Sequence, residues 1–413
     1  MRGRDQPADV AHVREHNLGL VVRLLRERGP ISRTEIAQAT GLVPASVTNL
    51  VGDLAARGLI REPQARRSAQ DRPPGRPRTM LELVPDRALV LAVQVQADTV
   101  TAELVPLVGP PVWARSTEHH APPGEPEGVV GAIGDLLAEA ARRARSVAAE
   151  LVACAVAMPG PVEAGTGVVA AAIDFGWHRV ALADLVARRL GDLPCPLVLV
   201  NDANAAALAE YQALEPPAPA VMLYVKADVG VGGGVVVDGR IFAGEMGFAG
   251  EIGHVSIDWH GRACFCGSVG CVATYLGPEA LLEDAGMGEL AARVGTAAAM
   301  DELERRAAAG DPRVVAVLAG AGQALGAGVL AASDVVNPGV VVLGGYLPRL
   351  LPWLSPGFDP VLDRRPSALR VGRVPVLLGR LGSHAALAGA AELGFERLLD
   401  DPSLVPELDR PSS

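Results

Sequence analysis

The sequence predicts an α/β body preceded by a mainly helical head, on the strength of three observations. The chain has 413 residues, which is too long for one ordinary hydrophobic core. From Ala88 onward, short apolar segments alternate with Ala- and Arg-rich helical segments, as in α/β proteins. Residues 1–80 contain fourteen arginines against eight carboxylates, a net charge of +6, which leaves −16 for the rest. A basic head on an acidic body favours a nucleic-acid partner for the head alone.

The head carries local signals for three short helices. Leucines and valines recur at helical spacing after Asn17, and this helix is predicted to end at Arg28-Gly29-Pro30. Ser32 and Glu35 form a capping box that opens a second helix, which is predicted to end at Gly41. Pro44 then suits the first turn of a third helix. Two helices joined by a glycine turn predict a helix-turn-helix.

The third predicted helix has one apolar face and one face of small residues. Its apolar residues recur at the spacing of a buried stripe and are Val47, Leu50, Val51 and Leu54. The outer face has nothing bulky at its tip, so it can enter a major groove and bond base edges or phosphates. The candidate DNA-binding residues on this face are Ala45, Ser46, Thr48 and Asn49. The alternative is a three-helix bundle that shares this pattern without binding DNA.

An arginine-rich segment at about residues 61–83 is predicted to form a wing. Short strands near Leu59-Ile60 and Met80–Leu83 bracket it, and its Pro73-Pro74-Gly75-Arg76-Pro77 run cannot be helical. Arginines on an extended tip suit a narrow minor groove. The candidates are Arg66, Arg67, Arg76 and Arg78. The alternative is a solvated basic linker, but the helix-turn-helix and the wing together favour DNA binding.

Two motifs of the body are typical of ligand-binding edges in α/β proteins. Asn201-Asp202 follows the apolar strand Val198-Leu199-Val200 and precedes an Ala-rich helix, where a carboxylate faces the crevice at the strand end. Asp202 there suits a general base, and the alternative is a helix cap. The glycines of Gly230–Gly234 allow backbone N–H groups to approach a phosphate, or they simply form a hairpin turn.

A cluster of one histidine and three cysteines predicts a structural zinc site. His254, Cys264, Cys266 and Cys271 lie within eighteen residues, and one imidazole with three thiolates matches closed tetrahedral zinc. The alternative is free buried cysteines. Zinc would also fix His254, so that its other ring nitrogen can face a ligand. Five cysteines with three in one cluster suggest a metal site in a reducing cytoplasm rather than a disulfide framework.

The sequence gives no sign of export or of membrane insertion. No segment combines a basic tip, an apolar run and a small-residue cleavage site, which predicts a cytoplasmic protein. Val314–Ser333 lacks charge for twenty residues, the length of a membrane span. Because it is mostly Ala and Gly, contains Gln323 and has no Trp or Tyr at either end, a buried core helix is predicted instead.

Taken together, these motifs resemble the ROK family of repressors, open reading frames and sugar kinases, from about Val84 to about Leu399. The segments that carry the resemblance are, in order, Pro159-Gly160-Pro161-Val162, Asn201-Asp202-Ala203-Asn204, Ala249-Gly250-Glu251-Ile252-Gly253-His254, Cys264–Cys271 and Asn337-Pro338 with Val341–Gly345. The resemblance implies a hexokinase/actin-like body of two α/β lobes around a cleft. The winged helix-turn-helix head is that of the family's transcriptional regulators.

The resemblance also implies domain bounds and residue roles. The head spans 1–83, a small α/β lobe 84–200, and a large lobe 201–399 with the zinc loop and a C-terminal helix returning to the small lobe; 400–413 is a tail. In the family's kinases the Asp of the Asn-Asp pair is the catalytic base, while the Asn and the Glu and His of Glu-x-Gly-His hold sugar hydroxyls. Asn201, Asp202, Glu251 and His254 are therefore predicted to bind an effector, with Asp202 a vestigial base.

Several departures from the family pattern argue against kinase activity. Family kinases begin the body with Asp-x-Gly-x-Thr, which organises nucleotide phosphates and magnesium. Here Gln94 and Gln96 stand at the Asp and Gly positions, so a magnesium ligand is lost and phosphate approach is obstructed. Asp228-Val229 replaces the usual Gly-Thr of the second phosphate loop. Ala273 stands where sugar-binding members have Glu, so one hydroxyl contact is missing.

The leading hypothesis is a kinase-inactive, sugar-responsive DNA-binding transcriptional regulator, and specifically a repressor of carbohydrate genes. Its partners would be double-stranded operator DNA, a sugar or sugar-derivative effector and a second copy of the chain, as a homodimer or tetramer, with structural Zn²⁺ and no membrane. One alternative is an active ROK sugar kinase with a DNA-binding head. Another is a ligand-free DNA-binding scaffold.

Overall fold

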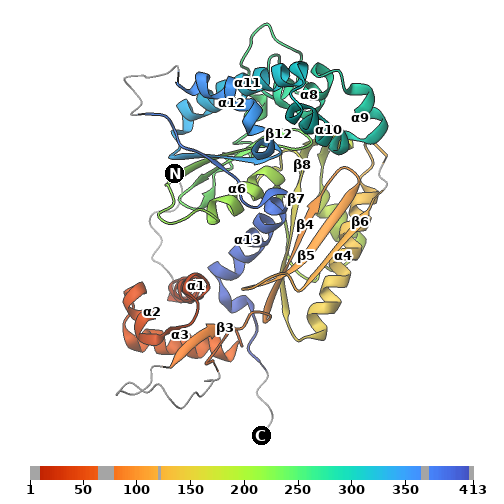
Figure 1. Cartoon of the computed structure of the whole chain (residues 1–413). Coiled ribbons are helices and arrows are strands. Elements are labelled where there is room, and N and C mark those ends of the chain that lie inside the picture. Colours follow the sequence, from red (N-terminus) through yellow and green to blue (C-terminus); the bar gives the residue numbers. More distant parts are fainter. Residues whose placement is uncertain (1–9, 64–78, 120–121, 364–371, 409–413) are drawn as a thin grey trace. The chain divides into compact units, whose positions relative to one another are not determined.

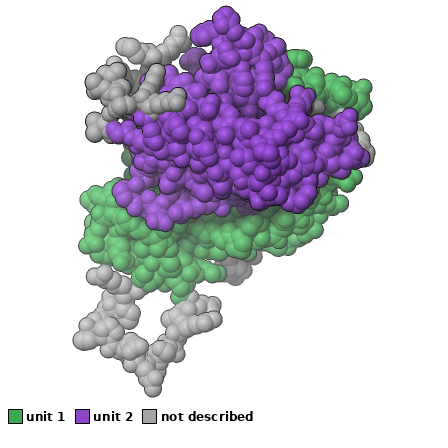
Figure 2. All heavy atoms as spheres, turned by 45° about the horizontal axis from the view of Figure 1, so that its top comes forward, with its two compact units in different colours: residues 1–158, 172–199, 390–413 green, residues 159–171, 200–389 purple. Residues whose placement is uncertain are grey.

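A computed structural model of the chain describes residues 10–63, 79–119, 122–363 and 372–408. The chain divides into two compact units, coloured separately in Figure 2. Unit 1 comprises residues 1–158, 172–199 and 390–413, and unit 2 comprises residues 159–171 and 200–389. The predicted domain bounds remain predictions, because this division follows compactness alone and groups the head with the first lobe.

The head contains three helices and a small sheet (Figure 1). Its elements are, in order, α1 (Val10–Arg28), β1 (Ile31–Ser32), α2 (Arg33–Thr40), α3 (Pro44–Ala56), β2 (Ile60–Arg61) and β3 (Met80–Leu83). The strands form a sheet of order β1-β3-β2, so β2 and β3 pair on either side of the segment predicted to form a wing. The three predicted helices and the two strands that bracket the predicted wing are therefore present.

The local signals of the head act as the sequence indicates. Ser32 caps α2 in a full capping box with Glu35, and Gly41 ends α2 with a φ of 72°, which glycine adopts without strain. Pro44 is the first residue of α3. The predicted inner residues of α3 are all buried, namely Val47, Leu50, Val51 and Leu54.

The rest of unit 1 is built on a five-stranded sheet of order β10-β7-β4-β5-β6. The strands are β4 (Ala88–Val95), β5 (Thr99–Pro106), β6 (Trp113–Glu118), β7 (Glu150–Met158) and β10 (Leu197–Asn201). β4 pairs with β5 antiparallel and with β7 parallel. Two helices complete this part, α4 (Glu127–Ser146) and α5 (Leu182–Leu190), which contact each other. The 3₁₀ helix η1 (Ile173–Phe175) and the short strand β9 (Trp177–Val180) also belong to unit 1, whereas all but the last residue of the short strand β8 (Val169–Ala172) belong to unit 2.

The hydrophobic core of the head includes the C-terminal part of the chain. Helix α13 (Ala385–Asp400) contributes Phe395, Leu398 and Leu399, and Val405 follows the 3₁₀ helix η4 (Pro402–Leu404). The Arg26 side chain of α1 donates to both carboxylate oxygens of Glu392 at 2.7 and 2.5 Å. Figure 1 shows this end of α13 beside α1.

Residues 401–408, predicted as part of a tail, are packed against the head. Arg57 donates to the Ser403 and Val405 carbonyls at 2.9 and 2.7 Å. Arg87 donates to the Arg57 carbonyl at 2.8 Å and to the Pro406 carbonyl at 2.9 Å. Because Arg87 is buried, these carbonyl acceptors replace the water that its guanidinium would otherwise bind.

Unit 2 is built on a second five-stranded sheet, of order β13-β12-β11-β14-β15. The strands are β11 (Val221–Ala227), β12 (Val231–Val237), β13 (Arg240–Ile241), β14 (Val340–Gly345) and β15 (Val376–Leu378). β11 pairs antiparallel with β12 and parallel with β14. Leu223, Val225 and Ala227 of β11 belong to a core shared with the helices that follow Cys271. Tyr224 and Lys226 alternate with them and therefore face the other side.

Helix α6 (Asp202–Gln212) packs against the glycines of β12, on the face of the sheet that carries Tyr224 and Lys226. A Cβ atom on Gly234 would lie 2.7 Å from the Ala207 Cβ, and one on Gly232 would lie 3.2 Å from the Ala203 Cβ. Residues 203–210 of α6 are all buried. The small residues on both surfaces thus allow the helix and the sheet to approach closely.

The large core of unit 2 lies among its helices. The helices are α7 (Ala273–Leu276), α8 (Pro278–Asp284), α9 (Gly288–Val294), α10 (Thr296–Ala308), α11 (Pro312–Val336) and α12 (Leu347–Asp363). Of these, α11 and α12 approach each other especially closely. Cβ atoms on Gly322 and Gly357 would lie 2.0 and 1.8 Å from carbonyl oxygens of the facing helix. Helix α11 passes a length and composition test for a membrane span, yet half of its most apolar window is buried inside the protein. This burial agrees with the predicted core helix.

Candidate functional site

The outer face of α3 presents the predicted DNA-contacting residues. Ala45, Thr48 and Asn49 are exposed and Ser46 is half-buried. The Thr48 hydroxyl donates to the Pro44 carbonyl at 2.9 Å, which fixes its direction on the helix. A hollow of about 310 Å³ lies between α2 and α3, lined by Arg33, Thr34, Ala37, Gln38, Pro44 and Thr48.

Of the segment predicted to form the wing, the structure describes only the two ends. β2 and β3 pair from Ile60 with Leu83 to Arg61 with Glu82, and the Arg61 side chain donates to the Glu82 carboxylate at 2.7 Å. Arg66, Arg67, Arg76 and Arg78 lie outside the described residues. Their predicted contact with a minor groove remains a prediction.

The Asn201-Asp202 pair lies where β10 meets α6, as the sequence predicts. The Asn201 side-chain oxygen accepts from the backbone N–H groups of Ala203 and Asn204, both at 3.0 Å, and so caps α6. Its amide nitrogen donates to the Gly160 carbonyl at 3.0 Å. Asn201 is therefore the cap, which leaves the Asp202 carboxylate in the first turn available to other partners.

Those partners include Lys226, a residue absent from the predicted site. Its ammonium group donates to Asp202 Oδ2 at 2.6 Å and to Asp228 Oδ2 at 3.0 Å. Lys226 is 8% exposed, and the two carboxylates hold its pKa well above the usual range although burial opposes this. Asp228, predicted to repel phosphate, is thus also the partner of a buried cation. The signal in the sequence was a charged residue within the apolar strand Val221–Ala227.

Glu251 precedes the short 3₁₀ helix η2 (Ile252–His254), and His254 is its last residue. The pKa of the Glu251 carboxyl is raised to about 7, mainly by burial and secondly by the negative charge of Asp202. Burial lowers the pKa of His254, which favours the neutral imidazole. The electrostatic influence of Asp202 on Glu251 is consistent with the predicted effector-binding set.

The glycines around η2 allow the backbone to fold closely onto the β11–β12 hairpin. A Cβ atom on Gly253 would lie 2.0 Å from the Val231 carbonyl oxygen. One on Gly233 would lie 2.8 Å from the Ile252 side chain and 2.9 Å from the Gly250 carbonyl oxygen. Larger residues would push the Glu251 and His254 segment away from the sheet. Close packing therefore explains these glycines without reference to a phosphate.

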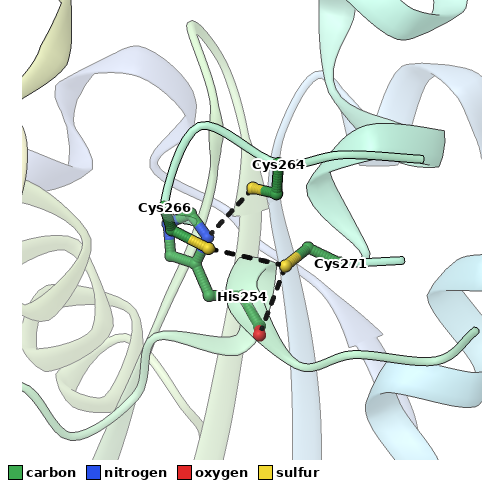
Figure 3. A group of neighbouring side chains, drawn as sticks. All are labelled: His254, Cys264, Cys266 and Cys271. Atoms are coloured by element: carbon green, nitrogen blue, oxygen red, sulfur yellow. Dashed lines mark hydrogen bonds between the residues drawn. The ribbon is translucent and has the colours of Figure 1, made fainter. Parts of the chain in front are cut away.

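The predicted metal ligands converge in one cluster (Figure 3). The ligand atoms of His254, Cys264, Cys266 and Cys271 all lie within 4.8 Å of one another. Cys264 Sγ lies 3.7 Å from His254 Nδ1, and Cys266 Sγ lies 3.7 Å from Cys271 Sγ. A tetrahedral zinc with Zn–S bonds of about 2.3 Å places its sulfur ligands about 3.8 Å apart. The donor set and its spacing thus fit such an ion.

The positions that depart from the kinase pattern lie in strands, turns and the start of a helix. Gln94 is in β4, and Gln96 follows it in the turn before β5, where its carbonyl lies 2.8 Å from His119 Nε2. Ala273 is the first residue of α7 and lies two positions after Cys271. Gln94 and Gln96 belong to unit 1, and Asp202 and Asp228 to unit 2.

Comparisons with known proteins place this arrangement in a family. The sequence model of the ROK family matches residues 113–396. The N-acetylglucosamine repressor of Escherichia coli O6:H1 (strain CFT073) is 26% identical over 409 residues, which cover 94% of this chain and 95% of the repressor.

Two solved structures resemble the chain over different lengths. A ROK family transcriptional regulator, described as a homologue of the E. coli MLC protein, has a TM-score of 0.76 at 25% identity and covers 94% of this chain and 97% of its own. A ROK family glucokinase from Streptomyces griseus, in complex with glucose and AMPPNP, has a TM-score of 0.60 at 27% identity and covers 74% of this chain and 98% of its own. These likenesses confirm the predicted hexokinase/actin-like α/β fold with a helical head, and the chain belongs to the ROK family.

Proposed function

We propose that the chain is a sugar-responsive, DNA-binding transcriptional repressor of carbohydrate genes. The observation that carries this proposal is the head. The regulator structure matches 94% of the chain, whereas the glucokinase matches 74%, so the head distinguishes the two kinds of relative. The N-acetylglucosamine repressor also extends over 94% of the chain. The protein would act in the cytoplasm, where operator DNA is accessible.

The head would bind DNA through α3 and the wing. The exposed start of α3 would enter a major groove and present Ala45, Ser46, Thr48 and Asn49 to base edges and phosphates. The arginines Arg66, Arg67, Arg76 and Arg78 would follow the adjacent minor groove. Two heads of a homodimer, or pairs of heads in a tetramer, would read two half-sites. Binding through arginines and phosphates would weaken as salt concentration rises.

The effector would bind at the start of α6. Asp202, Glu251 and His254 supply acceptors and donors for hydroxyl groups, and Asn201 holds the helix start in place. A ligand shifts the DNA-competent state only by as much as its affinity differs between two conformations. The proposed response is therefore a change in operator affinity when the sugar is present.

A zinc ion held by His254, Cys264, Cys266 and Cys271 would stabilise the loop that positions these residues. The ion supplies structural cross-linking, since four protein ligands leave no open position for substrate or water. Because Nδ1 of His254 lies beside Cys264, Nε2 remains for the effector. The residues of this chain would thus join metal binding and effector binding through one imidazole ring.

The proposed protein is not an active kinase. Gln94 and Gln96 replace the family's phosphate-site Asp and Gly, and Lys226 binds the Asp202 carboxylate that a kinase would use as a base. The second candidate function, an active ROK sugar kinase with a DNA-binding head, is favoured by the retention of Asp202 at the start of α6. ATP turnover against a hexose panel separates them, because Asp202-dependent phosphorylation would contradict the proposal.

The repressor function is tested with the full chain. Genomic fragments retained by the protein identify an operator, and fluorescence anisotropy then measures its affinity with and without a panel of sugars. We expect sequence-selective binding that one sugar changes. A Ser46→Ala, Asn49→Ala variant is the control for specific contacts, because both side chains lie on the outer face of α3. Binding that is no tighter than to random DNA would refute the DNA-binding role.

A further inference from the structure

Lys226 is an unusual choice of residue for this chain. The thirty-seven basic residues are thirty-six arginines and this single lysine. It is also buried, at 8% exposure, at the end of β11. A sequence that otherwise uses arginine for every basic position thus places a compact ammonium group at the start of α6, where the proposed effector site lies.

The surroundings of Lys226 accommodate an extended lysine side chain. Its partners across the sheet are Gly232 on β12 and Gly344 on β14, so no side chain stands directly opposite it on either neighbouring strand. The Lys226 Cε lies 4.0 Å from the position of a Cβ on Gly232. The side chain therefore passes beside Gly232, and its ammonium group donates to Asp202.

The ammonium group retains capacity for a ligand. It has three protons, and two of them are used in the bonds to Asp202 and Asp228. Asp202 Oδ2 accepts from Lys226, while Oδ1 lies 3.5 Å from the Asn201 side-chain nitrogen, at the outer limit of a hydrogen bond. A donor and an acceptor therefore lie next to each other, and a hydroxyl group can serve both because it donates and accepts.

The charges around Lys226 disfavour an anionic ligand. Two carboxylates, Asp202 and Asp228, face one ammonium, so this trio carries a net charge of −1. Asp202 is 17% exposed and lies in a partly dry site, where like charges are screened weakly. A phosphate group at this position would face unprotonated carboxylate oxygens that cannot donate to it.

We propose that Lys226 and Asp202 form the ligand-selecting pair of this chain, which binds hydroxyl groups of an uncharged sugar and, with Asp228, excludes phosphorylated sugars. This inference rests on the proposed function, since it names the effector class of that same site. Lys226 donates to one hydroxyl oxygen and Asp202 accepts the proton of the same or the adjacent hydroxyl. The Asp202 carboxylate forms an ion pair with Lys226. In this state it serves the sugar as a hydrogen-bond acceptor.

The single lysine makes a direct test possible. In the full chain labelled with [ζ-¹⁵N]lysine, one ammonium resonance reports on Lys226. The titrants are glucose, xylose and N-acetylglucosamine, together with glucose 6-phosphate, xylose 5-phosphate and N-acetylglucosamine 6-phosphate. We expect at least one neutral sugar to shift the Lys226 resonance saturably. We expect its phosphate ester to bind about tenfold more weakly or not at all, because of the net negative charge.

Two charge-matched variants test the exclusion of phosphate. Asp228→Asn removes one carboxylate from the trio, and Asp238→Asn removes the same charge from the turn between β12 and β13. Asp238 has a φ of 49°, which asparagine tolerates. We expect Asp228→Asn to reduce the preference for neutral over phosphorylated sugar about tenfold, and Asp238→Asn to leave it unchanged.

Distinct outcomes separate this inference from the proposed function. A phosphorylated sugar that binds as tightly as its neutral parent overturns the inference and leaves the repressor function standing. The same holds if a neutral sugar binds by calorimetry without moving the Lys226 resonance, or if the two variants behave alike. If no sugar of either class binds while operator DNA does, the sugar response itself is refuted and the inference with it.

Discussion

Phe395 offers a sharp test of the finding that the C-terminal helix belongs to the core of the DNA-binding head. It is 0% exposed and lies in a core with the buried residues of α1 and α3. The Arg26 guanidinium lies 5.3 Å from its ring centre. Replacing a buried phenylalanine with alanine costs about 3–5 kcal/mol through lost burial and the cavity left behind. Phe395→Ala should therefore destabilise the head, although it lies far from α3 in sequence.

Hydrogen exchange is the suitable assay, because a chain of two units need not unfold in one step. We expect amide protection of peptides from α3 to fall about 10²- to 10⁴-fold in Phe395→Ala, and operator affinity to fall with it. Phe358→Ala is the matched control, because Phe358 is 1% exposed in the core of unit 2. Unchanged α3 protection in Phe395→Ala, or an equal loss in Phe358→Ala, would refute the shared core.

Three further predictions concern the metal, the DNA and the effector residues. Cys271→Ser should reduce bound zinc from about one ion per chain to nearly none after dialysis, because one of four ligands is lost; metal analysis showing full retention would contradict the site. Asn49→Ala should weaken operator binding about ten- to hundredfold at an unchanged melting temperature, which anisotropy and calorimetry measure. The pKa of Glu251 is about 7 in the fold against an ordinary 4.5, so the folded state binds its proton more tightly and stability should decline as pH rises through about 4.5 to 7. Denaturant unfolding at pH 6 and 7.5 should show this decline in the wild type and a flatter profile in Glu251→Gln, and equal profiles would count against it.

Features set by neighbouring residues could be predicted from the sequence. The capping box of Ser32 and Glu35, the left-handed Gly41 and the first-turn Pro44 are local devices, and the structure confirms each. The metal cluster was also predictable, because its three cysteines lie within one short loop and His254 lies just before it. Such signals depend on a few consecutive residues and need no knowledge of the distant chain.

Features set by distant residues could not be predicted in the same way. The ion pair of Lys226 with Asp202 requires β11 and the start of α6 to lie together, although the residues are 24 positions apart. The bonds from Arg57 to the Ser403 and Val405 carbonyls join residues 346 and 348 positions apart. No local periodicity encodes such pairings, because they arise from how complete elements pack. The predicted tail at 400–413 missed these contacts for the same reason.

Helix α6 packs closely on β12 directly beneath the residues that would hold an effector. The Ala207 methyl group lies so close to β12 that a Cβ atom added to Gly234 would be 2.7 Å from it. Closely packed elements have low compressibility and transmit strain to their neighbours. A sugar bound at Asn201 and Asp202 would therefore displace β12 and α6 together. This joint displacement would be the first step of the response that changes DNA binding.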